Sequence, residues 1–350
     1  NARGITPTLI WTDAPNPKIV EENDLKLNFE QVAFRFSTET IANSNNALRY
    51  LLWPFNAIYA SKLKKKYDFI YTFTHIFIND TDVPFAFYLS GPPYLPQLNP
   101  QHGIKKLRFS FTEAMYKIFL KPFLPIYEFR GTPENTVINA QFTSDLFFDA
   151  HGIRLDVVYP SNAFTLNLEK GFVNKEGVVF LSRVVPYKRP EMVIELAKKH
   201  TNIPFSIVGT VDHNQEGYYQ ALKALVEKYE LSNVKFIVNQ PFELLQAALA
   251  KAKFYVFPAV DEHFGITTVE AIMSGTIPFV HNSGGQKEIV DLEALRFEDE
   301  EFFEKFEALI HADVNTLLQY QEHFYQRAEL FSEESYNTKM LSYIEWINSQ

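Results

Sequence analysis

Residues 178–190, VVFLSRVVPYKRP, decide the fold class of this chain. The first four residues are apolar and mostly β-branched or aromatic, which predicts a short strand, and Pro190 stands where proline suits the first position of a helix. The run has no polar alternation, so we expect its sheet to be covered on both faces. A strand, a polar loop and a helix in this order predict one unit of a parallel α/β sheet.

The same unit repeats through the second half of the chain. Helix-length amphipathic stretches occur at 191–200, 218–229, 242–250 and 267–273, and they alternate with apolar runs at 205–208, 234–238, 254–257 and 277–280. Pro241 precedes one predicted helix, and Gly275 stands where another should end. Repeated crossovers of this kind predict a doubly wound parallel sheet.

The first half has a less regular pattern. Short strands are expected at 7–11, 69–73, 83–89 and 135–139, and stretches 47–64 and 105–120 look helical and are rich in aromatic and basic residues. Pro160-Ser161-Asn162 is the candidate linker to the second half.

Composition excludes several classes of protein. The chain has 350 residues, of which 46% are hydrophobic and 15% aromatic, so it can form two packed domains and is not disordered. It contains no cysteine, which excludes disulfides, thiolate metal sites and a cysteine nucleophile, and fits a reducing compartment such as the cytoplasm. We expect neither a membrane span nor a signal peptide. The net charge of −9 argues against nucleic acid as the main partner.

The charge is unevenly distributed. Residues 44–130 contain 11 basic and 5 acidic residues, and several of the lysines lie beside aromatic side chains. This pattern fits peripheral contact with an anionic membrane surface. It fits equally a domain whose aromatics form the core and whose lysines are solvated.

The strongest candidate site is the stretch 261–270, DEHFGITTVE, which follows a predicted strand and begins a helix. Gly265 would let a ligand approach the backbone closely, and the N–H groups of Ile266, Thr267 and Thr268 at the helix start would favour an anion such as phosphate. The candidate ligand-binding residues of this stretch are Glu262, Phe264, Gly265, Ile266, Thr267 and Glu270. Taken alone, the stretch could also be an ordinary helix start.

Two further loops carry candidate residues. Arg183 and Lys188, five positions apart in a proline-stiffened loop, suit a diphosphate, because arginine binds as a fork and lysine as a point charge. Glycines that allow close backbone contact follow two other predicted strands, at Gly209 and at Gly284-Gly285. All these loops follow strands of one predicted sheet, and open α/β sheets bind ligands at the carboxyl ends of their strands.

Together these residues resemble the retaining glycosyltransferases of family 4, which have the GT-B fold of two Rossmann-like domains facing across a cleft. Glu262 and Glu270 match the family's Glu-x7-Glu motif, Arg183 and Lys188 its Arg-x4-Lys motif, and residues 284–290 its Gly-Gly-x-x-Glu-Ile-Val segment. Stretches 139–143 and 157–160 resemble the strand and linker before the family's second domain. The variants EHFG (262–265) and HNSGG (281–285) are most similar to mannosyltransferases that extend dolichol-linked oligosaccharides.

The resemblance implies a function and a set of roles. The chain would move a hexose, best mannose, from GDP-mannose or a UDP-sugar to a glycan or glycolipid hydroxyl, with no metal and no other cofactor. Arg183 and Lys188 would stabilise the departing diphosphate, the equivalent of Glu262 holds donor-sugar hydroxyls, and that of Glu270 the ribose. Phe264 to Thr267, Gly209, Gly284 and Gly285 would line the donor site.

The resemblance also implies the domain limits. Residues 1–159 would bind the acceptor, 160–325 would bind the nucleotide sugar, and a helix within 326–350 would cross back to the first domain. The family begins with a strand, a Gly-rich turn and a helix, whereas residues 4–12 here resemble its second strand, so about one β-α unit is expected to be missing. Many relatives carry a histidine before the Pro-Pro pair that corresponds to Pro92-Pro93, where this chain has Ser90-Gly91.

Other functions stay open at this point. A nucleotide-sugar epimerase of the same fold would need an added acid and base, and a non-catalytic sugar-nucleotide-binding subunit would fit a missing first unit. A nicotinamide-dependent enzyme is disfavoured, because no Gly-x-Gly-x-x-Gly follows any predicted strand. Asp80-Thr81-Asp82 and the acidic run 298–301 are interpreted as a solvated turn and a solvated edge. The nine histidines lack metal-ligand spacing.

Overall fold

The computed structural model describes residues 8–11, 28–31, 69–72, 85–90, 132–162, 164, 171–172 and 174–349. The chain divides into two compact units, one formed by residues 1–88 and 93–136 and the other by 89–92 and 137–350. The domain limits inferred above, at 159/160 and 325/326, stay a prediction. The predicted helices at 47–64 and 105–120, and Asp80-Thr81-Asp82, lie outside the described residues.

The described part of the first unit consists of short parallel strands. β1 (Thr8–Trp11) pairs with β2 (Asn28–Gln31), and β3 (Ile70–Thr72) pairs with β4 (Phe85–Leu89). The predictions of strands near 7–11, 69–73 and 83–89 are confirmed, whereas β2 was not predicted. Its sequence, NFEQ, has one apolar residue in four, and therefore carries no strand signal.

The second unit begins with β5 (Thr136–Ile138), which pairs in parallel with β6 (Asp156–Val157). Helix α5 (Gln141–His151) connects them and ends at Gly152, whose φ of 70° is the left-handed conformation that favours glycine at a helix end. Residues 141–143, which resembled part of a strand, form the first turn of this helix.

The core of the second unit is a six-stranded parallel sheet in the order β12-β11-β10-β7-β8-β9. Its strands are β7 (Val178–Leu181), β8 (Phe205–Gly209), β9 (Val234–Val238), β10 (Phe254–Phe257), β11 (Ile277–His281) and β12 (Arg296–Phe297). The first five are the predicted runs. β7, β10 and β11 are completely buried, as expected for a sheet covered on both faces.

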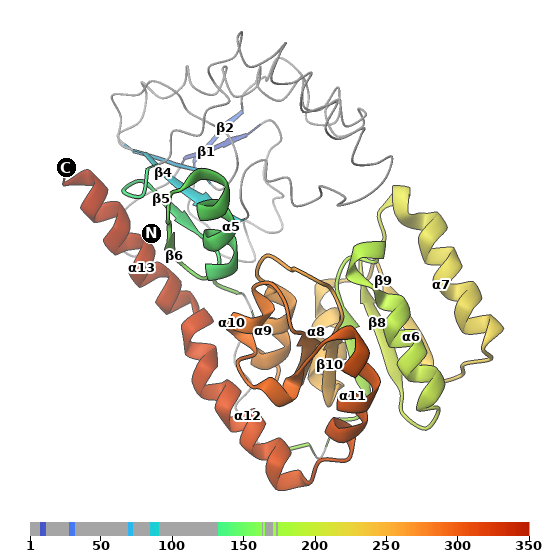
Figure 1. Cartoon of the computed structure of the whole chain (residues 1–350). Coiled ribbons are helices and arrows are strands. Elements are labelled where there is room, and N and C mark those ends of the chain that lie inside the picture. Colours follow the sequence, from blue (N-terminus) through green and yellow to red (C-terminus); the bar gives the residue numbers. More distant parts are fainter. Residues whose placement is uncertain are drawn as a thin grey trace. The chain divides into compact units, whose positions relative to one another are not determined.

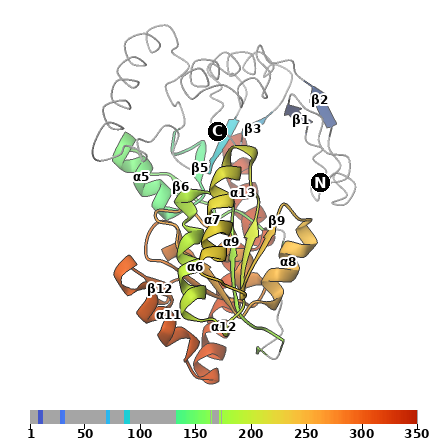
Figure 2. The same ribbon diagram turned by 90° about the vertical axis from the view of Figure 1, so that its right-hand side faces the viewer.

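The helices of this sheet confirm the predicted crossovers. α6 (Pro190–Lys199) and α7 (Glu216–Lys228) pack together on one side, and α8 (Phe242–Lys251) and α9 (Ile266–Met273) pack together on the other (Figures 1 and 2). Pro190 is the first residue of α6, and Gly275, with φ 71°, follows the end of α9, both as predicted. Lys175 ties the two helices of the second side, since its ammonium group donates to the carbonyls of Ala250 (2.7 Å) and Ser274 (2.8 Å) at their ends.

The chain ends in helices. After β11 come the short α10 (Gln286–Ile289), then α11 (Phe302–Ile310), α12 (Val314–Ala328) and α13 (Glu333–Asn348). Among the apolar side chains of α13, Met340 is buried, and Tyr336, Tyr343 and Ile344 are half-buried. The crossing of this helix to the first domain stays a prediction.

Candidate active site

The sheet order places the site. β7 begins the sheet, β8 and β9 add on one side of it, and β10, β11 and β12 add on the other, so the direction of winding reverses between β7 and β10. In open α/β sheets, ligands bind at such a switch point, outside the carboxyl ends of the strands. Residues 182–190 and 258–265 follow these two strands, and they contain Arg183, Lys188 and the first half of the candidate stretch 261–270.

Lys188 and Glu262 meet at this point. Lys188 ends the short 3₁₀ turn η5 (Pro186–Lys188), is 8% exposed, and forms an ion pair with the Glu262 carboxylate. Its ammonium group also lies 5.2 Å from the ring centroids of Tyr187 and Phe257, a distance at which aromatic rings attract cations. A buried charge is costly without a partner, so each group of the pair compensates the charge of the other.

Arg183, the other cation of the motif, lies in a different environment. Its side chain is exposed, and its guanidinium donates to the Tyr187 hydroxyl (2.5 Å). The motif therefore offers one buried lysine and one solvent-facing arginine, linked by the ring of Tyr187. Exchanging the hydrogen bond from Arg183 to the neutral Tyr187 hydroxyl for one to a phosphate would be favourable, because a bond between two charged groups is stronger.

The start of α9 follows Glu262 closely. Gly265 precedes the helix with φ 107°, a conformation that strains every other residue, and Ile266 is partly exposed. The N–H of Thr268 donates to the Gly265 carbonyl (2.9 Å), so the prediction that this N–H is available to a ligand is wrong. The hydroxyl of Thr267 is 2.7 Å from that of the buried Tyr255, which fixes its rotamer.

Glu270 and Phe264 are both largely buried. Burial raises the pKa of Glu270 to about 7, because a desolvated carboxylate favours its neutral form. The ring of Phe264 stacks on Tyr159 (5.7 Å between centroids) and contacts Phe331 (5.9 Å). Contact between Phe264 and a donor would therefore have to use its backbone.

The three glycines bring loops into close contact. A Cβ on Gly209 would lie 1.7 Å from the Ser182 carbonyl oxygen, and Cβ atoms on Gly284 and Gly285 would lie 2.4 Å from the carbonyl oxygens of Glu262 and His263. The N–H of Gly285 donates to the carbonyl of Glu262 (2.7 Å). The Gly-Gly pair thus lets the loop before α10 support the backbone of Glu262.

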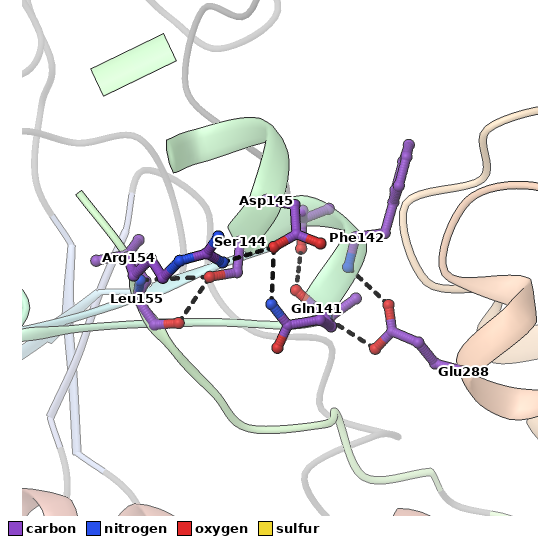
Figure 3. Close-up of polar contacts among 9 residues, drawn as sticks. Gln141, Phe142, Ser144, Asp145, Arg154, Leu155 and Glu288 are labelled. Carbon is purple, nitrogen blue, oxygen red and sulfur yellow. Dashed lines mark hydrogen bonds and ion pairs between the residues drawn. The ribbon is translucent and has the colours of Figure 1, made fainter. Parts of the chain in front are cut away.

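Glu288, three residues further on, connects this loop to α5. Its carboxylate accepts hydrogen bonds from the backbone N–H groups of Gln141 and Phe142, both at 2.7 Å (Figure 3). The residue before α5, Ala140, has no side chain that can cap the helix, so Glu288 performs the capping from 146 residues away. Burial raises the pKa of Glu288, and the two backbone donors oppose that shift.

Tyr159, directly before the candidate linker, contacts both motif loops. Its ring stacks on Phe264, and its hydroxyl hydrogen-bonds to Glu288. Burial, reinforced by the Glu288 charge, raises the pKa of Tyr159 to about 12, so the phenol stays neutral and donates. Sequence reasoning did not select Tyr159, because a lone tyrosine beside a proline gives no chemical signal.

Ser90, in the place of the histidine that many relatives carry, hydrogen-bonds through its backbone to the ring of His263. An imidazole from the Glu-x7-Glu loop therefore lies beside that position. Burial lowers the pKa of His263, which keeps the ring neutral at pH 7.

The acidic run 298–301 is exposed, as interpreted from the sequence, and two of its residues also contact neighbouring loops. Asp299 forms an ion pair with Arg189 (2.8 Å), and Glu298 accepts from the Asn282 amide (2.7 Å). The sequence hides these contacts, since four successive acids look like a solvated surface.

The described residues contain no group of three or more His, Asp or Glu side chains arranged to hold a metal ion. Among them no helix is long and apolar enough to cross a membrane.

Comparison with known proteins agrees with the motifs. Residues 169–329 match the family model described as "Glycosyl transferases group 1". These residues include β7 to β11 and every candidate residue of the second unit. The resemblance to family 4 glycosyltransferases is therefore confirmed for the part of the chain that carries the site.

Relatives with established names extend this result. The chain is 27% identical over 234 residues to the "GDP-Man:Man(3)GlcNAc(2)-PP-Dol alpha-1,2-mannosyltransferase" of Yarrowia lipolytica, a match that covers 59% of this chain and 36% of the relative. The chain thus spans little more than a third of that relative's length. The prediction of a likeness to mannosyltransferases of lipid-linked oligosaccharides is confirmed.

Solved structures confirm the predicted GT-B fold class. A glycosyltransferase from Rickettsia africae has a TM-score of 0.68 and 16% identity, and the match covers 99% of this chain and 91% of that chain. HepE from Anabaena, solved with UDP and glucose, has a TM-score of 0.69 and 17% identity over 97% of this chain and 91% of that chain. At these identities the likeness concerns the fold alone.

Proposed function

We propose that this protein is a retaining mannosyltransferase that moves mannose from GDP-mannose to a hydroxyl of a lipid-linked glycan. The observation that carries the proposal is the Lys188–Glu262 ion pair at the switch point of the sheet, inside the segment that matches the glycosyltransferase model. The choice of mannose and of GDP rests on the name of the Yarrowia relative.

The reaction exchanges one bond at the anomeric carbon. The bond from C1 of mannose to the diphosphate oxygen breaks, the acceptor oxygen bonds to C1 on the same face, and the acceptor's proton passes to the departing phosphate. The transition state carries negative charge on the leaving oxygen and positive charge on the sugar, so fixed cations beside the phosphate accelerate it.

Each candidate residue has a role in this reaction. Arg183 and Lys188 would bind the diphosphate and offset its charge without a metal ion. Glu262 would accept hydrogen bonds from the mannose hydroxyls, and its contact with Lys188 couples sugar binding to phosphate binding. Glu270 would accept from the ribose, and the start of α9 would contact the phosphate through backbone N–H groups.

The acceptor belongs to the first domain in this proposal. A lipid-linked glycan would be presented at a membrane surface, and the basic stretch 44–130 would contact its anionic lipid headgroups. That stretch falls mostly outside the described residues, and its role here is based on its charge pattern in the sequence.

The test is product analysis with purified protein. GDP-mannose, UDP-glucose and UDP-N-acetylglucosamine are each offered with a mannose-terminated glycan on a lipid pyrophosphate, with and without EDTA. We expect transfer from GDP-mannose in both conditions, giving a product that α-mannosidase cleaves. No transfer from any donor would overturn the proposal, conversion of the donor without acceptor would indicate an epimerase, and loss of transfer in EDTA would refute metal independence.

A further inference from the structure

Two strained residues flank the Lys188–Glu262 pair. Arg189, directly after Lys188, has φ 58°, and Asp261, directly before Glu262, has φ 52°. Residues with a Cβ rarely adopt such a backbone, and they keep it only where their surroundings enforce it. The contacts that enforce it here therefore also fix the two partners of the pair.

Both residues contact one chain of polar side chains. At one end, the Arg189 guanidinium forms an ion pair with Asp299 (2.8 Å) and donates to the Pro258 carbonyl (3.2 Å), which brings the loop after β7 to the loop after β10. At the other end, the N–H of Asp261 donates to the Ser283 hydroxyl (2.7 Å).

His281 joins the two ends. Its Nδ1 is 2.9 Å from the Ser283 oxygen, and its Nε2 is 3.5 Å from the carboxylate oxygen of Asp299 that also contacts Arg189. The Ser283 hydroxyl, which accepts from Asp261, has its own hydrogen to donate to Nδ1 of His281. In that tautomer the ring hydrogen is on Nε2, on the side of Asp299.

The charges of this group favour the same arrangement. Burial lowers the pKa of His281, which favours the neutral ring, although Asp299 and Glu298 oppose the shift. Arg189 lowers the pKa of Asp299, which keeps the carboxylate charged. Asp299 therefore acts on both strained residues, directly on Arg189 and through His281 and Ser283 on Asp261.

We infer that Asp299 is a positioning residue that holds Lys188 and Glu262 at the sugar–phosphate bond of the donor, an inference that rests on the proposed function. Asp299 touches neither Lys188 nor Glu262. It fixes the backbone on which each of them stands, so its loss should affect the reaction more than the fold.

The test neutralises two acids of the short 3₁₀ turn η8 (Asp299–Glu301) in separate variants, Asp299→Asn and Glu300→Gln. Glu300 is exposed and has the same charge, which makes it a matched control. We expect Asp299→Asn to lower kcat by about 10- to 100-fold, because misplacement of about 1 Å costs rate on this scale, and Glu300→Gln to match wild type. Circular dichroism and thermal unfolding show whether each variant is folded.

A second variant tests the chain itself. Ser283→Ala breaks it at the far end, and we expect the double variant Asp299→Asn/Ser283→Ala to lose no more rate than the slower single variant. If the rate losses of the two single variants multiply in the double variant, the inference is overturned. It is also overturned if the rate of Asp299→Asn is within threefold of that of Glu300→Gln. In both cases an active wild type still supports the proposed function. A wild type that transfers no sugar overturns both.

Discussion

Lys188 and Glu262 form an ion pair although 74 residues separate them in the chain. Their side chains are only 10% and 19% exposed, and they follow two strands, β7 and β10, that are neighbours in the sheet. Exposed ion pairs contribute little to stability, but a buried one leaves an uncompensated charge when one partner is removed. Removing one partner of this pair should therefore change both the stability of the protein and the rate of the proposed reaction.

Lys188→Ala is expected to reduce transfer by at least about 100-fold, the effect of removing one preorganised charge donor from a transition state. It should also lower the free energy of unfolding, by about 3 kcal/mol, because Glu262 loses its counter-charge. Initial rates and urea unfolding measure the two effects.

Two variants separate chemistry from stability. Lys188→Ala/Glu262→Gln removes the unpaired charge, so it should recover most of the stability and none of the activity. Lys198→Ala removes an exposed lysine of α6 that contacts Glu195 and the ring of Tyr229, so it should leave activity unchanged and lower stability by at most about 1 kcal/mol. A Lys188→Ala rate within threefold of wild type would refute the phosphate-binding role.

Glu270 should make stability depend on pH. Its pKa of about 7 lies above the value of 4.5 expected in the unfolded chain. Its favourable contribution is therefore complete below pH 4.5 and is lost as pH rises through 7, to an extent of about 3 kcal/mol. Relative to Glu270→Gln, wild type should lose urea resistance between pH 5 and pH 8.5.

Donor binding should show the opposite trend. Only the ionised Glu270 accepts hydrogen bonds from both ribose hydroxyls, so KM for the donor should fall as pH rises from 6 to 8. Glu270→Gln should raise KM and flatten this dependence. A KM in wild type that is constant over this range would remove the ribose role.

The sheet of the second unit and its motif loops could be predicted from the sequence, because their signals come from short runs of neighbouring residues. The strand at 178–181 and the helix after Pro190 follow from an apolar run and a proline, and a strand's end fixes where the next loop begins. Parallel strand order then brings Lys188 and Glu262 to one edge without any knowledge of their side-chain contacts.

What the sequence did not predict are contacts between loops. Asp299 lies in an acidic run, His281 has no ligand spacing, and Tyr159 is a lone aromatic, so none has a local signature. Each acquires its role from a partner at least 18 residues away, such as Arg189, Asp299 or Glu288. The burial of the Phe264 ring likewise depends on Tyr159 and Phe331, which no spacing rule connects to it.

Two glycines give a contrasting pair of predictions. Gly209→Ala places a Cβ 1.7 Å from the Ser182 carbonyl at φ 148°, so it should unfold the protein or greatly lower its stability. Gly217→Ala, in the first turn of α7, meets nothing within 4 Å and should raise the free energy of unfolding by up to about 1 kcal/mol. Thermal unfolding of both variants is the measurement, and a stable Gly209→Ala protein would contradict the close contact of β8 with the loop after β7.

The last prediction concerns two acids that contact the start of α5 (Figure 3). Glu288 accepts from the backbone N–H groups of Gln141 and Phe142, whereas Asp145 pairs with Arg154 (2.8 Å) on the exposed surface of the same helix. In Glu288→Gln one carboxylate oxygen becomes an NH₂ group that cannot accept, so one of the two backbone donors is left without a partner. The loss of a helix cap costs about 1–2 kcal/mol, and the loss of an exposed ion pair about 0–1 kcal/mol. Urea unfolding should therefore rank Glu288→Gln clearly below Asp145→Asn. Equal stability of the two variants would mean that water, rather than Glu288, satisfies the start of α5 in solution.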